Sequence, residues 1–75
     1  MKTVKEYLVE LERNKEGRPE QVRDGLEIYI ELWRKTILRG VIADSDRVED
    51  ALEKIEKAGG LYTAAEGPTD AAPTG

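Results

Sequence analysis

The sequence predicts an all-α fold, a small three-helix bundle with a long central second helix and a disordered C-terminal tail. Apolar residues recur at helical spacing in three separate segments, and each segment is bounded by residues that start and stop helices. Residues 63–75 show no periodicity and consist mostly of Ala, Gly, Pro and Thr. Charged residues make up 37% of the chain, which is typical of a well-solvated helical surface.

The first helix is predicted over residues 4–15. Thr3 and Glu6 form an S/T-x-x-E capping box, in which each side chain satisfies the backbone N–H of the other residue. Gly17 follows as a C-terminal stop. The apolar stripe of this helix contains Val4, Tyr7, Leu8 and Leu11.

The second helix is predicted over residues 19–39 and is the longest of the three. Pro19 suits the first helical position, where its missing N–H costs nothing, and Gly40 suits a left-handed stop. Its main apolar stripe contains Val22, Leu26, Tyr29, Ile30, Trp33 and Ile37. We expect Trp33, in the middle of this stripe, to lie in the core.

The third helix is predicted over residues 47–58. Asp46 with Glu49 resembles a capping box, and the pair at 59–60 is Gly-Gly, which ends a helix. The apolar connector at 41–43 is expected to pack against the core. Residues 1–62 then form one domain, and residues 63–75 form a tail that we expect to be dispensable for folding.

A second apolar stripe runs beside the main stripe of the second helix. Its members recur at i, i+3, i+7 and i+11 and are Gly25, Ile28, Leu32 and Thr36. The two stripes together avoid water over roughly 200° of the helix, about twice the arc that an ordinary surface helix buries. Two neighbouring helices account for part of this arc, but the first and third helices offer too few large apolar side chains to cover all of it. We therefore expect these four residues to form an interface, in a homodimer or with a protein partner.

Catalysis is not expected. The chain has no Cys and no His, so its hydroxyl groups have no imidazole base and the usual ligands of zinc are missing. The segment Asp44-Ser45-Asp46 begins like a calcium loop, but Glu49 stands where such a loop needs Gly. We expect no metal, no cofactor and no small-molecule substrate.

Nucleic-acid binding is the alternative function. Four basic residues form a candidate patch: Arg34, Lys35, Arg39 and Arg47. The segment from Ala51 to Leu61 resembles the last helix and exit of winged-helix domains. That helix presents mostly carboxylates where a recognition helix needs Arg, Lys, Asn or Gln, and the net charge of the chain is −4. A helix-turn-helix-like DNA- or RNA-binding regulator therefore ranks second.

The pattern as a whole predicts a non-enzymatic helical module for protein interaction or regulation, which self-associates through its second helix. No stretch approaches the ~18 to 20 apolar residues of a membrane span, and the N-terminus lacks a signal-peptide pattern. We therefore expect a cytoplasmic protein without membrane contact.

Overall fold

The computed structural model describes residues 2–67, and these residues form four α-helices. The helices are α1 (Val4–Lys15), α2 (Glu20–Leu38), α3 (Val48–Lys57) and α4 (Leu61–Glu66). The predicted all-α class is confirmed. The predicted number of helices is wrong, because the described chain contains α4 in addition to the three that were expected.

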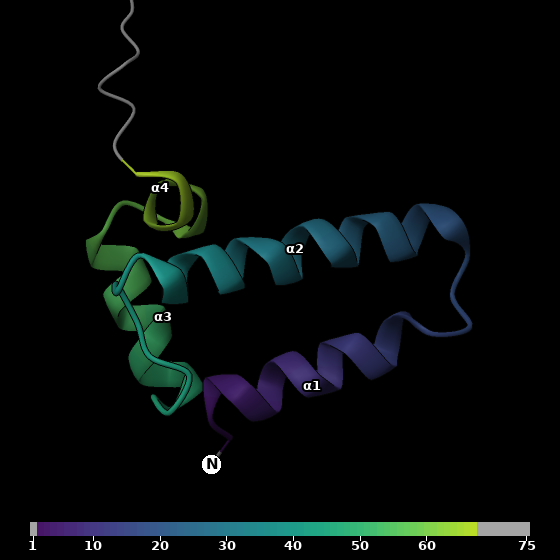
Figure 1. Cartoon of the computed structure of the whole chain (residues 1–75), viewed down its shortest axis with the longest axis horizontal. Helices are drawn as coiled ribbons and strands as arrows, with labels where there is room; N and C mark the ends of the chain where they lie inside the picture. Colours follow the sequence, from purple (N-terminus) through teal and green to yellow (C-terminus); the bar gives the residue numbers. More distant parts are fainter. Residues whose placement is uncertain (1, 68–75) are drawn as a thin grey trace, which may run out of the picture.

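The helices do not form the predicted bundle in which the second helix lies between the first and the third. α1 and α2 run antiparallel as a hairpin, α3 crosses the open end of this hairpin, and α4 lies against the C-terminal end of α2 (Figure 1). α2 is the longest helix, with 19 residues. Its two helical neighbours in the described chain are α1 and α4, whereas α3 packs on α1 and α4.

The start of α1 is held by the connector between α2 and α3. The predicted capping box is confirmed: the Glu6 N–H donates to the Thr3 hydroxyl, and the Thr3 N–H donates to the Glu6 carboxylate. The backbone N–H of Val4 also donates to the carbonyl of Asp46 at 2.8 Å. These contacts satisfy amide groups that a helix start leaves without partners, and they bring the connector onto α1.

The predicted capping role of Asp46 is wrong. The residue at the N-cap of α3 is Arg47, and its side chain makes no capping hydrogen bond. The Asp46 carboxylate instead accepts a hydrogen bond from the backbone N–H of Ala43 at 3.0 Å and one from the Lys54 ammonium at 2.9 Å. These two bonds, the backbone bond first, hold the pKa of Asp46 below its ordinary value of 3.8.

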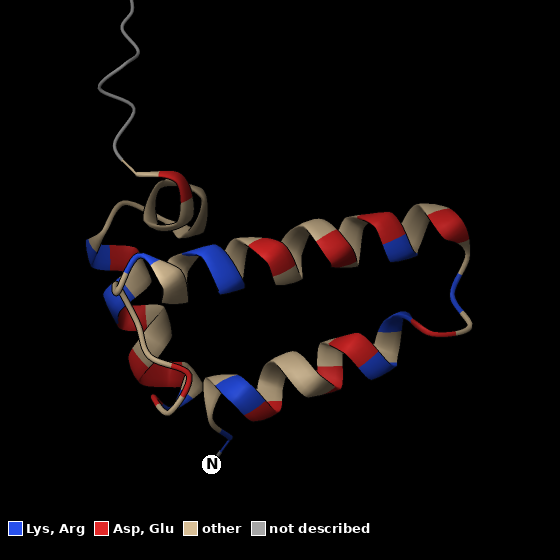
Figure 2. Cartoon of the chain, viewed as in Figure 1, with Lys and Arg blue, Asp and Glu red and all other residues tan. Residues whose placement is uncertain are grey.

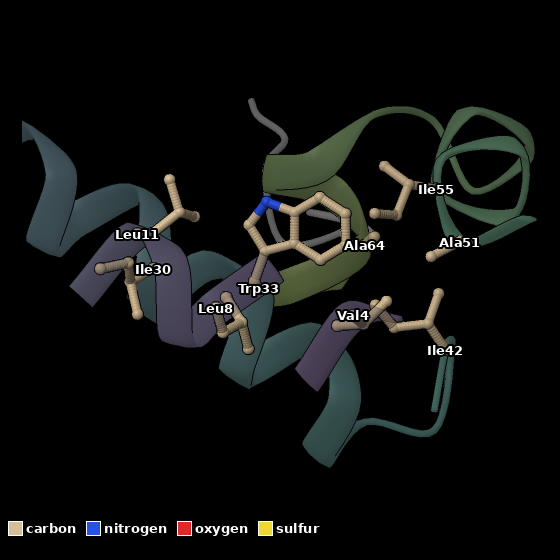
Figure 3. Close-up of a cluster of buried hydrophobic side chains, with 9 residues drawn as sticks. All are labelled: Val4, Leu8, Leu11, Ile30, Trp33, Ile42, Ala51, Ile55 and Ala64. Carbon is tan, nitrogen blue, oxygen red and sulfur yellow. The ribbon is translucent and has the colours of Figure 1, made fainter. Parts of the chain in front are cut away.

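The core is a cluster of small and medium apolar side chains around Trp33 (Figure 3). Trp33 is 1% exposed, and its ring meets the ring of Tyr7 edge to face with 5.5 Å between the centroids. Ile42 is buried, so the expected packing of the connector on the core is confirmed. The buried cluster contains Val4, Leu8, Leu11, Ile30, Trp33, Ile42, Ala51, Ile55 and Ala64.

The expected disordered tail does not hold for residues 63–67. Thr63 is the third residue of α4, and the side chains of Ala64 and Ala65 are buried. A chain that ends at Tyr62 would lose these contacts, and whether residues 63–75 are dispensable for folding stays a prediction. The rest of the predicted tail, 68–75, lies outside the described residues.

Within residues 2–67, no helix is both long enough and apolar enough to cross a bilayer.

Candidate interaction surface

The second apolar stripe of α2 is divided into a covered part and an uncovered part. Thr36 is fully buried, and its hydroxyl donates to the carbonyl of Leu32 at 2.7 Å. Gly25 is exposed, Ile28 is 64% exposed and Leu32 is half-buried. The structure therefore brings three of the four candidate interface residues to the surface and places Thr36 inside the chain. We call the surface formed by Gly25, Ile28 and Leu32 the open face of α2.

The position of α4 explains this division. α4 lies beside the last turns of α2, and no other described helix lies beside the N-terminal half of α2 on that side (Figure 1). The described molecule is only 16 Å deep along its shortest axis, whereas one helix with its side chains is about 10 to 12 Å wide. Such a thin arrangement cannot cover both sides of α2 along its whole length.

Gly25 has no side chain, so the backbone of α2 is accessible at this point of the open face. A Cβ atom at this position would meet no other atom within 4 Å, so the folded chain itself does not require glycine there for space. The φ angle of Gly25 is not positive, so its backbone conformation does not require glycine either. Glycine in the middle of a helix costs about 0.5 to 1 kcal/mol relative to alanine. A second helix that packs closely on this point would account for that cost.

Two carboxylates stand along the rim of the open face. Asp24 lies four residues before Ile28 and Glu31 lies three residues after it, so both stand next to Ile28 on the helix surface. Both are exposed, and neither makes an ion pair within the described chain. Figure 2 shows acidic residues recurring along α2. Helical spacing from Ile28 places both carboxylates beside the stripe, so this rim could have been predicted from the sequence.

The candidate basic patch is not gathered at one place. Arg34 is directed to α1, where its guanidinium pairs with Glu12 at 2.6 Å. Lys15 donates to the same carboxylate at 3.1 Å and lowers its pKa, and Lys15 also pairs with Glu27 at 3.2 Å. These pairs join α1 to α2. Arg47 stands apart from them, at the N-terminus of α3.

The other two basic residues of the patch hold α4. The Lys35 ammonium pairs with Glu66 at 2.9 Å, and this partner raises the pKa of Lys35. The Arg39 guanidinium donates to the carbonyl of Ala64 at 2.7 Å and to that of Thr63 at 3.3 Å. Carbonyl groups in the last turn of a helix lack partners within the helix, so Arg39 caps the C-terminus of α4.

Two tyrosine hydroxyl groups meet between α1 and α2. Tyr7 and Tyr29 face each other with their hydroxyl oxygens 3.2 Å apart. Burial, together with this hydrogen bond, raises the pKa of Tyr7 to about 12, so the phenol stays protonated in neutral solution. Within residues 2–67, no group of three or more acidic side chains is arranged to hold a metal ion. The hydrogen bond between Tyr7 and Tyr29 joins α1 to α2 beside the ring of Trp33.

Comparison with known proteins finds no family model, no curated protein and no solved structure that matches this chain. The fold and the surface alone therefore describe this chain: it is a small all-α protein, and the longest of its described helices has one apolar face that is not covered.

Proposed function

We propose that this chain is a non-enzymatic protein-interaction module and that the open face of α2 is its contact surface. The exposure of Ile28 carries the proposal. An isolated exposed apolar residue is common and says little, but Ile28 lies between Gly25 and half-buried Leu32 in one apolar stripe. Covering a side chain such as Ile28 contributes about 1.5 to 3 kcal/mol. A helix laid along this face would gain that stabilisation over several turns.

A second copy of the chain is the occupant that the sequence predicts for this surface. A symmetric pair of α2 helices would place Gly25 and Ile28 of both copies in one interface. In the proposed role, the module regulates a partner protein that binds to this face. The compartment proposed from the sequence is the cytoplasm.

Nucleic-acid binding receives less support from the geometry. Three of the four basic candidates, Arg34, Lys35 and Arg39, are engaged by partners within the chain. The carboxylates on the rim of the open face would repel phosphate groups, since nucleic-acid affinity depends on clustered, available Lys and Arg.

Sedimentation velocity over a wide range of protein concentration tests self-association. The proposal expects the mean mass to rise with concentration for the wild-type chain and to stay at the monomer mass for the Ile28→Glu variant. The Val9→Glu variant is the control, because Val9 is 45% exposed and lies on α1 rather than on α2. Fluorescence anisotropy with labelled duplex DNA at low salt tests the alternative, which requires binding with a steep salt dependence.

A further inference from the structure

The rim of the open face carries charge that a second copy of the chain does not complement. In an antiparallel pair of α2 helices centred on Ile28, Asp24 would stand near Glu31 of the second copy, which brings like charges together beside a surface that is losing water and opposes association. In a parallel pair, the carboxylates of one copy would instead face the edge formed by Gly25 and Leu32 of the second copy, which offers them no cation.

The chain has few groups that would neutralise this rim. The cation nearest along the same helix face is Lys35, four residues after Glu31. Its charge attracts Glu31 from a distance, but its ammonium forms its ion pair with Glu66. Arg34 is directed away to Glu12 on α1. Asp24 and Glu31 thus remain available to cations that a partner supplies.

From this pattern we propose that the open face of α2 binds a basic amphipathic helix of another protein. The apolar side of such a helix would cover Ile28 and Leu32 and pack closely at Gly25, while its Lys or Arg side chains would pair with Asp24 and Glu31. This inference rests on the proposed function, because it takes the open face as the contact surface and adds the chemistry of the occupant.

Two synthetic peptides test the proposal with the full chain. Both are helical, about 18 residues long, and carry the same single stripe of Leu; one has Lys at all other positions and one has Glu. Binding is measured by calorimetry, and amide chemical shifts of the labelled protein locate the contact. We expect the Lys peptide to bind with shifts concentrated at residues 21–32, and the Glu peptide to bind at least tenfold more weakly.

Two matched variants separate the rim from the overall charge of the chain. The Asp24→Asn/Glu31→Gln variant should bind the Lys peptide about three- to tenfold more weakly, the range expected for two exposed ion pairs at low salt. The Glu49→Gln/Glu53→Gln variant changes the net charge equally but lies on α3, so it should bind like the wild type. High salt should reduce the difference between the two variants.

The outcomes distinguish failure of this inference from failure of the proposed function. Equal binding of the two peptides, or equal effects of the two variant pairs, overturns the basic-helix proposal. A wild-type chain that self-associates through Ile28 and shows no preference for the Lys peptide also overturns it, but leaves the open face as an interaction surface. If Ile28→Glu changes neither peptide binding nor self-association, the proposed function itself fails.

Discussion

Trp33 organises the packing of this small core. It is 1% exposed, and the rings of Tyr7 and Tyr29 meet it edge to face, at centroid distances of 5.5 and 6.3 Å. Edge-to-face pairs add about 0.5 to 1.5 kcal/mol beyond the burial of area. The indole N–H has no hydrogen-bond acceptor among the described residues, so part of this stabilisation is offset by an unsatisfied donor.

The Trp33→Ala substitution tests this central role. We expect it to lower the free energy of unfolding by about 3 to 5 kcal/mol, because it removes the largest buried side chain and leaves a cavity. Urea denaturation followed by circular dichroism measures the change. A variant with an unchanged midpoint would show that Trp33 is not part of the core.

The lowered pKa of Asp46 predicts how the stability of the fold depends on pH. Its pKa is lowered in the folded chain, so its carboxylate stabilises the fold above the ordinary pKa of 3.8, and this contribution is lost as the pH falls through the folded value. The Asp46→Asn variant lacks this titration. We expect its melting temperature to lie below that of the wild type near neutral pH and the gap to close at about pH 2. A gap of constant size would contradict the assignment.

The helices differ in how much of each could be predicted from the sequence. The bounds of α1 depend on local signals, because Thr3 and Glu6 cap its start and Gly17, with a φ of +78°, follows its end. α4 has only six residues and no side-chain cap, so nothing local distinguishes it from a loop. It is held by Lys35 and Arg39, which are 24 to 31 residues away in the sequence.

Arg39→Met tests how α4 is held. The guanidinium caps α4 and packs against Gly67, where an added Cβ would lie 3.2 Å from one of its nitrogens. We expect the loss of about 1 to 2 kcal/mol of stability, toward the lower end of the range for hydrogen bonds that involve a charged group, because Arg39 is exposed. Arg23→Met is the control, because Arg23 is also an exposed arginine and lies on α2 without an ion pair in the described chain. Hydrogen exchange at residues 63–66 should quicken in the first variant only.

At the scale of the whole molecule, the site depends on an arrangement that no single segment encodes. The stripe of Gly25, Ile28 and Leu32 was visible in the sequence, because it follows from helical spacing alone. The burial of Thr36 was not, because it depends on where the described chain places α4. The carboxylates Asp24 and Glu31 became a rim only once the apolar face beside them was found uncovered.

The Ile28→Glu/Leu32→Glu variant tests most directly whether the open face is a contact surface. Since Ile28 is 64% exposed and Leu32 is half-buried, the account predicts a helical, folded monomer that is destabilised by only about 1 to 2 kcal/mol and has lost self-association and peptide binding. The Val9→Glu/Leu52→Glu control places the same charges at exposed apolar positions of α1 and α3 and should keep both activities. Circular dichroism with sedimentation velocity measures the outcome. A double variant that fails to fold, or that associates and binds peptide like the wild type, would contradict the account.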